Sequence, residues 1–371
     1  MTKSIEKKVR VLVVDDSAFM CKVLQEIIGS DPQLQVVGQG RDGREAVALA
    51  ATLRPDVITM DINMPHVDGL QATEQIMSSD PRPIIIVSSE SREGAATTLR
   101  ALELGAIDFV PKPSSGIDLD MRNVRDELTR KLKLAAKVRV VRTATRAKIP
   151  MAPASQAPAS SGAAAGAVRS SGGGKIPMVA IAASTGGPAA VTRVVAGLPA
   201  DLPAAVFLVL HMPPAFTKQF ALQLAETSAL LVKEAEMNET PQPGTIYVCP
   251  GSHHLRLSST GKITLDSGAR IEGYRPCADV AFESIASYAR GMMVAVVLTG
   301  MGNDASKGVK AVKAAGGRVF AQDESTSTIF GMPAEAIKSG CVDEVLRLDE
   351  IGAAIAKQAA KLDRLMPVGV R

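Results

Sequence analysis

A serine in the second half of the chain has the setting of an exposed nucleophile. Ser184 directly follows an apolar run at residues 179–183, and Gly186 and Gly187 just after it would let the backbone turn sharply into a helix. The same turn could instead hold a phosphate on its backbone amides, and the segment taken alone favours neither interpretation. If Ser184 is a nucleophile, it needs a general base and a carboxylate that orients this base.

His211 is the candidate general base. It directly follows the apolar run at residues 205–210, so it would lie, like Ser184, at the carboxyl end of a strand. Of the other three histidines, His66 belongs to a motif in the first half, and we expect His253 and His254 to lie in a solvated turn.

Asp304 is the candidate orienting carboxylate, because it closes the segment 298–304 after a third apolar run, residues 292–298. Its alternative role is to cap the helix that follows. Three such residues, each after a strand, favour a catalytic set over three coincidences. Their order along the chain is Ser, His, Asp, which differs from the Ser, acid, His order of ordinary α/β-hydrolases and disfavours that class.

In the first half, three carboxylates and a lysine also follow apolar runs. Asp15 and Asp16 come after the first run and Asp61 after the third, while Ser88 follows the fourth and Lys112 the fifth. Carboxylates gathered at one sheet edge repel one another, so a divalent cation and an ammonium group are needed to stabilise them. Oxygen ligands suit Mg²⁺, and a carboxylate in such a site can accept a phosphoryl group.

The elements that must position these residues alternate between strands and helices in both halves. In the first half, five strands are expected at residues 9–14, 35–38, 56–60, 83–87 and 107–110. The spacer after the first strand has helical spacing of Phe19, Val23, Leu24, Ile27 and Ile28 and ends at Gly29. Alternation of this kind predicts a (βα)5 domain with a parallel sheet covered on both faces.

The second half predicts a larger, doubly wound α/β domain with a mostly parallel, mixed sheet. Buried strands are expected at residues 179–183, 205–210, 292–298 and 318–321. Residues 245–248, 254–257 and 262–265 are expected to form a β meander.

A linker separates the two halves. From Ala152 to Gly174, 20 of 23 residues are Ala, Ser, Gly or Pro, a composition with little to bury. Seven basic residues and no acidic one lie between Lys137 and Lys175, so the net charge of +4 is local to this segment. We therefore expect domains at 8–130 and 176–365, joined by a basic linker at 131–175.

Composition limits the function further. Aromatic residues make up 3% of the chain and Trp is absent, which disfavours binding of single-stranded nucleic acid by base stacking. The four cysteines are far apart, as expected for reduced thiols in a cytoplasmic protein. The apolar runs are too short to insert into a membrane, and the N-terminal basic run leads into a strand rather than a signal peptide.

The first half resembles the receiver domains of two-component response regulators over about residues 8–130. The resemblance rests on the loop 60–69 around Asp61, on Asp15-Asp16, on Ser88 and on Lys112-Pro113. It implies that Asp61 is the phosphoacceptor and that Ser88 and Lys112 contact the phosphoryl oxygens. It also implies Mg²⁺ as the cofactor of phosphorylation, held by Asp15, Asp16, Asp61 and the carbonyl of Asn63.

The second half resembles the chemotaxis protein-glutamate methylesterase family. The resemblance rests on six motifs, at residues 184–188, 211–214, 247–251, 275–276, 298–304 and 330–333. It implies Ser184 as nucleophile, His211 as base and Asp304 as orienter. It further implies an oxyanion site that includes the Met301 backbone amide, with Thr185 nearby.

Together the two resemblances imply a phosphorylation-activated hydrolase for adaptation in chemotaxis. Its substrates would be glutamate methyl esters and glutamines of methyl-accepting chemoreceptors, its phosphodonor a chemotaxis histidine kinase, and its hydrolytic step would need no cofactor. We expect a monomer whose unphosphorylated receiver covers the active site. The alternatives are a receiver joined to an inactive domain that signals by contact, and a DNA-binding regulator, which lacks a recognisable helix-turn-helix segment here.

Overall fold

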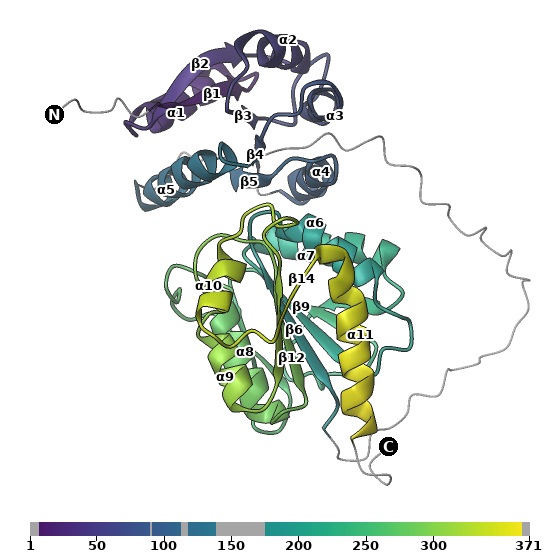
Figure 1. Ribbon diagram of the computed structural model, residues 1–371. Helices are drawn as coiled ribbons and strands as arrows, with labels where there is room; N and C mark the ends of the chain where they lie inside the picture. The colour runs from purple at the N-terminus through teal and green to yellow at the C-terminus, as the bar shows by residue number, and fades with distance from the viewer. Residues whose placement is uncertain (1–6, 90, 113–117, 139–174, 366–371) are drawn as a thin grey trace, which may run out of the picture.

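The computed structural model describes residues 7–89, 91–112, 118–138 and 175–365. Each of the two expected domains is built around its own sheet (Figure 1). Most of the expected linker, residues 139–174, and Pro113 lie outside the described residues.

The first domain has a five-stranded parallel sheet in the order β2-β1-β3-β4-β5, as the (βα)5 prediction requires. Its strands are β1 (Val9–Val14), β2 (Leu34–Gly40), β3 (Val57–Met60), β4 (Ile84–Ser88) and β5 (Asp108–Pro111). Its helices are α1 (Ala18–Gly29), α2 (Gly43–Leu53), α3 (Gly69–Ser79), α4 (Arg92–Glu103) and α5 (Asp118–Ala135). Strand residues alternate between two apolar clusters, so α1 and α5 cover one face of the sheet and α2, α3 and α4 cover the other.

Two details differ from the expectation for this domain. Phe19 does not join the core beside Leu24 and Ile28, since 68% of it is exposed at the start of α1. Helix α5 continues past residue 130 to Ala135 because Leu132 and Ala135 are buried against the sheet.

The second domain has a seven-stranded sheet in the order β14-β13-β12-β6-β7-β9-β8. Its strands are β6 (Met178–Ala183), β7 (Ala205–Leu210), β8 (Leu231–Glu234), β9 (Thr245–Val248), β12 (Met293–Val297), β13 (Arg318–Gln322) and β14 (Glu344–Leu346). Helices α6 (Gly187–Ala196), α7 (Pro214–Thr227) and α11 (Leu348–Arg364) pack on one face of this sheet. On the other face lie α8 (Ala278–Ala289), α9 (Gly308–Ala314) and α10 (Met332–Lys338).

The predictions of a mixed sheet and of a β meander are wrong in part. All described pairings in the seven-stranded sheet are parallel, and β9 belongs to this sheet between β7 and β8. All four residues of β9 are buried, as expected for a strand covered on both faces. The antiparallel part is only the hairpin of β10 (His254–Leu257) and β11 (Ile263–Asp266). The edge strands β8 and β14 were not expected, because they are short and partly exposed.

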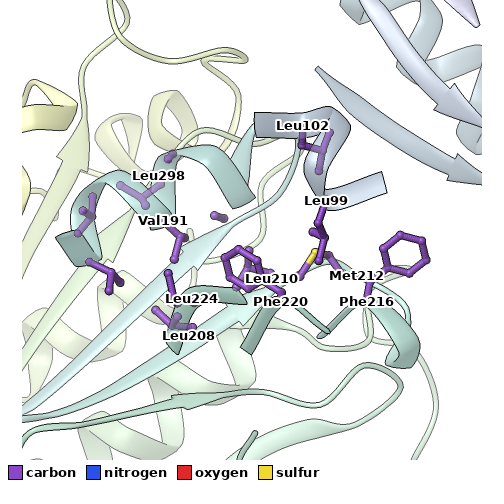
Figure 2. Packing of buried hydrophobic residues seen from close by; sticks show 14 of the residues in the cluster. Leu99, Leu102, Val191, Leu208, Leu210, Met212, Phe216, Phe220, Leu224 and Leu298 are labelled. Carbon is purple, nitrogen blue, oxygen red and sulfur yellow. The ribbon is translucent and has the colours of Figure 1, made fainter. Parts of the chain in front are cut away.

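The two domains pack against each other through α4 and β5 of the first. Phe109 of β5 stacks on Phe216 of α7, with ring centroids 4.1 Å apart. Figure 2 shows Leu99 of α4 beside Met212, near Phe216 and Phe220 of α7, with Leu102 farther along α4. All five residues belong to one buried apolar cluster. This contact places the first domain over the carboxyl ends of β6 and β7.

Among the residues that the structure describes, none of the helices combines the length and the apolar character that crossing a bilayer requires.

Candidate functional sites

Strand register brings Ser184 and His211 together. Ala183 of β6 pairs with Leu210 of β7, so the next residue on each strand is the expected nucleophile or base. Ser184 is half-buried, and its amide donates a 3.1 Å hydrogen bond to the carbonyl of Thr299. The turn behind it needs Gly186, which has φ of 74°, and where a Cβ would lie 2.5 Å from Thr328 Oγ1.

His211 and Asp304 form a direct pair. His211 Nε2 lies 2.7 Å from Asp304 Oδ2, and the carboxylate side chain is fully buried. The other ring nitrogen, Nδ1, is buried and has no hydrogen-bond partner among the described residues. The pairing thus fixes which nitrogen faces the carboxylate and leaves Nδ1 able to take a proton.

Asp304 is held by the first turn of α8. Its carboxylate accepts hydrogen bonds from the amides of Ala278, Asp279 and Ala305, and from the thiol of Cys277 at 3.2 Å. Burial opposes the charge, but these bonds and His211 outweigh it and lower the pKa of Asp304 to about 2. Asp304 therefore stays ionised beside His211 at neutral pH.

Asp304 was also a candidate to cap the helix after it. In the structure Asp304 caps α8 instead, and a residue of α8 caps the helix after Asp304. Asp304 serves the start of α8, and Asp279 of α8 accepts from the amides of Lys307 and Gly308 at the start of α9. Burial raises the pKa of Asp279 to about 6. The sequence offered no signal for Cys277 or Asp279, because these caps join segments about 25 residues apart.

Thr185 and Met301 lie at the same edge of the sheet. The Thr185 hydroxyl donates a 2.5 Å hydrogen bond to Asp108 Oδ2 of the first domain, and its carbonyl accepts from Thr299 Oγ1. The Met301 amide has no acceptor among the described residues, so it is available to a ligand. Met301 also lines a cavity of about 580 Å³ that it shares with α5.

His254 departs from its expected solvated position. It is 1% exposed, and its Nε2 lies 3.0 Å from the carbonyl of Ala269. It is the first residue of β10, which pairs with β11 and not with the seven-stranded sheet.

In the first domain, Lys112 joins two of the three expected carboxylates. Its ammonium lies 3.0 Å from Asp15 Oδ2 and 2.9 Å from Asp61 Oδ2. Burial raises the pKa of Asp61, although Lys112 opposes this effect. For Lys112, burial acts against the ammonium, but Asp61 and Asp15 raise the pKa overall.

The other residues expected at this site, Asp16, Asn63 and Ser88, differ in exposure and in hydrogen bonding. Asp16 and Asn63 are exposed, and Asp16 offers an oxygen within 4.8 Å of those of Asp15 and Asp61. Ser88 is buried, and its hydroxyl donates to the carbonyls of Gly94 and Ser89 rather than to Asp61. A contact between Ser88 and a phosphoryl group on Asp61 would require the hydroxyl to leave these carbonyls.

This donor set fits Mg²⁺. Asp15, Asp16 and Asp61 gather hard carboxylate oxygens, two from buried residues and one from an exposed residue that leaves a path from solvent. Asp15 Oδ2 is buried and, among the described residues, has no partner besides the Lys112 ammonium.

Comparison with known families identifies both domains by similarity. Residues 179–355 match the CheB methylesterase family, and residues 11–146 match the response regulator receiver domain. A solved structure, the CheB methylesterase catalytic domain of Thermotoga maritima, is 40% identical and covers 49% of this chain and 98% of that chain, with a TM-score of 0.48.

Relatives also match over nearly the full length. A protein of Symbiobacterium thermophilum is 44% identical over 96% of this chain and 99% of its own length. A protein of Pyrococcus horikoshii is 44% identical over 95% of this chain and 94% of its own. Both are named protein-glutamate methylesterase/protein-glutamine glutaminase.

Proposed function

Since the chain belongs to the CheB methylesterase family and carries a receiver domain, we propose that Ser184, His211 and Asp304 carry out its hydrolytic reaction. The protein is a protein-glutamate methylesterase and protein-glutamine glutaminase of chemotaxis. The observation that carries the proposal is the pairing of His211 with a carboxylate held ionised, together with a strand register in which Ser184 and His211 each directly follow a paired residue, Ala183 or Leu210.

In the first half of the reaction, Ser184 Oγ attacks the carbonyl carbon of a glutamate methyl ester. The hydroxyl proton passes to His211 Nδ1, and the charge on the imidazolium is stabilised by Asp304 through Nε2. The negative charge on the carbonyl oxygen is stabilised by the Met301 amide, which is otherwise unpartnered among the described residues. When the tetrahedral intermediate collapses, methoxide leaves with the proton from His211 as methanol.

In the second half, water hydrolyses the glutamyl ester of Ser184. His211 takes a proton from the water, the acyl–oxygen bond to Ser184 breaks, and the serine recovers its proton. The product is a glutamate carboxylate. A glutamine side chain follows the same path, with ammonia as the first leaving group.

In the receiver, Asp61 is the proposed phosphoacceptor, with Lys112 and Ser88 as phosphoryl contacts. The ion pairs of the half-buried Lys112 with Asp15 and Asp61 support this role, because an ammonium beside the acceptor compensates incoming negative charge. Asp15, Asp16, Asp61 and the Asn63 carbonyl would hold Mg²⁺, which when bound neutralises charge on the transferred phosphoryl group. The proposed phosphodonor is a chemotaxis histidine kinase.

The proposed substrates are chemoreceptors, and membranes that carry them provide the test. Receptor methyl esters are labelled with radioactive methyl groups, and methanol release is measured with and without a small phosphodonor. A parallel sample with glutamine at the same positions reports ammonia. We expect both products and a rate increase with the phosphodonor, whereas a protein that signals only by contact would release neither.

A further inference from the structure

A tyrosine that the sequence did not single out lies flat against the candidate base. The rings of Tyr274 and His211 are stacked, with centroids 4.3 Å apart and an angle of 18° between their planes. The stack covers one face of the imidazole, while its edge is bound to Asp304 through Nε2. Two constraints, one on the edge and one on the face, thus act on a single catalytic ring.

Backbone hydrogen bonds within its own loop fix the position of Tyr274. Tyr274 and Ile271 exchange two backbone hydrogen bonds, of 2.9 and 3.0 Å, that close a tight turn. The next residue, Arg275, donates to the carbonyls of Ser267 and Gly268 and so ties the base of this loop. The ring is therefore presented to His211 by a closed loop.

The far end of the ring meets the loop that carries the Met301 amide. A Cβ built on Gly302 would lie 2.1 Å from the Tyr274 hydroxyl, and Gly302 has φ of 90°. Only glycine fits both the backbone conformation and the space there. Tyr274 thus spans from the imidazole to the residue that follows the candidate oxyanion donor.

Asp304 alone does not fix the imidazole. The Cβ–Cγ bond and a single hydrogen bond through Nε2 still let the ring turn about the axis between Cγ and Nε2, and such a turn changes the direction in which Nδ1 points. A flat aromatic face at van der Waals distance opposes this rotation. Loss of alignment by about 1 Å costs on the order of a hundredfold in rate.

The geometry points to Tyr274 as a positioning residue, whose ring holds the His211 imidazole in the plane that directs Nδ1 at Ser184. The inference rests on the proposed roles of Ser184 and His211. It requires the aromatic ring of Tyr274 and not its hydroxyl.

The test uses the full-length protein with Mg²⁺ and a small phosphodonor, and compares Tyr274→Phe, Tyr274→Leu and Tyr274→Ala. Tyr288→Ala serves as the control, because Tyr288 is a half-buried tyrosine on α8 whose ring contacts Lys175 instead of the site. Two rates are measured for each variant, receptor demethylation and modification of Ser184 by a sulfonyl fluoride. In the second reaction the Oγ–S bond forms, the S–F bond breaks, the proton goes to His211 and fluoride leaves.

We expect Tyr274→Phe to stay within about threefold of the wild type in both rates. Tyr274→Leu and Tyr274→Ala should lose about tenfold to a hundredfold in kcat and in the sulfonylation rate, with KM for receptor and the melting temperature little changed. Leucine keeps the site filled if alanine unfolds the loop. The inference is overturned if the leucine variant is modified at the wild-type rate, or if phenylalanine loses as much as alanine. Sulfonylation needs no receptor, so it tests Tyr274 even if receptors prove not to be the substrate.

Discussion

The hydroxyl of Thr185 donates a 2.5 Å hydrogen bond to Asp108 Oδ2, which joins the residue after Ser184 to the last strand of the receiver. Both residues are buried, at 5% and 8% exposure. Lys131 of α5 backs Asp108 with an ion pair of 3.2 Å and donates to the carbonyl of Phe109. A receiver residue therefore contacts the residue next to the candidate nucleophile.

Replacing Asp108 with alanine should raise the basal rate of the unphosphorylated protein. A buried hydrogen bond to a charged group contributes about 1.5–3 kcal/mol. Its loss should therefore shift the equilibrium between docked and separated domains about tenfold or more toward separated domains. Demethylation without phosphodonor measures the effect, with Asp349→Ala on the exposed start of α11 as the control. An unchanged basal rate in Asp108→Ala would show that this hydrogen bond does not limit access.

Asp304→Asn should destabilise the catalytic domain in a pH-dependent way. The pKa of Asp304 is about 2 in the folded protein against an ordinary value of 3.8, so the folded state binds fewer protons than the unfolded state between these values. Its stabilisation is full above about pH 5 and is lost as the pH falls toward 2. The free energy of unfolding should drop by about 2 kcal/mol at pH 7 and by roughly half as much at pH 3. Urea denaturation at both pH values tests this, and an equal loss at both would contradict it.

Asp279→Asn should stabilise the catalytic domain at neutral pH, whereas Asp304→Asn destabilises it. Its pKa is raised to about 6, so the folded state holds a proton that the unfolded state releases, and stability falls as the pH rises from about 4 to 6. Asparagine keeps an oxygen for the amides of Lys307 and Gly308 without the charge. The variant should be close to the wild type near pH 4 and exceed it by about 3 kcal/mol at pH 7. Lower stability than the wild type at pH 7 would show that the ionised carboxylate is needed as a cap.

Asp61→Asn should abolish stimulation by a phosphodonor without lowering basal demethylation, because the amide cannot accept the phosphoryl group. Chelation of Mg²⁺ should have the same effect on the wild type, since stimulation depends on the carboxylates of Asp15, Asp16 and Asp61. Rates are measured with and without phosphodonor for each sample. Retained stimulation in Asp61→Asn would place the phosphoacceptor elsewhere.

The sequence predicted the residues whose positions depend on strand ends. Ser184 and His211 follow continuous apolar runs that are buried on both faces, and such runs mark parallel strands without tertiary information. Asp15, Asp16 and Asp61 of the receiver also come directly after apolar strands, so their positions could be predicted in the same way. Apolar runs were insufficient for β9, because its four buried residues fit either a meander or a central strand.

Contacts between distant segments could not be predicted. Three interactions depend on how loops and domains pack. They are the hydrogen bonds from α8 amides to Asp304, the stacking of Tyr274 on His211, and the hydrogen bond from Thr185 to Asp108. No local pattern of residues around 274 or 108 distinguishes these side chains from ordinary loop and strand positions. For Phe19 a local pattern gave the wrong prediction. Its helical spacing with Leu24 predicts a buried side chain, but Phe19 lies at the start of α1 and is exposed.

The proposed reaction depends above all on Ser184 as its nucleophile. The most direct measurement is methanol release from methylated receptor by Ser184→Ala and wild-type protein, both with phosphodonor and matched in folding by circular dichroism. We expect Ser184→Ala to lose on the order of 10⁴ to 10⁶ in rate with the fold intact, because the half-buried hydroxyl is not part of either core. A variant that keeps more than about a tenth of the wild-type rate would show that Ser184 is not the nucleophile, since losing a triad nucleophile costs far more than this.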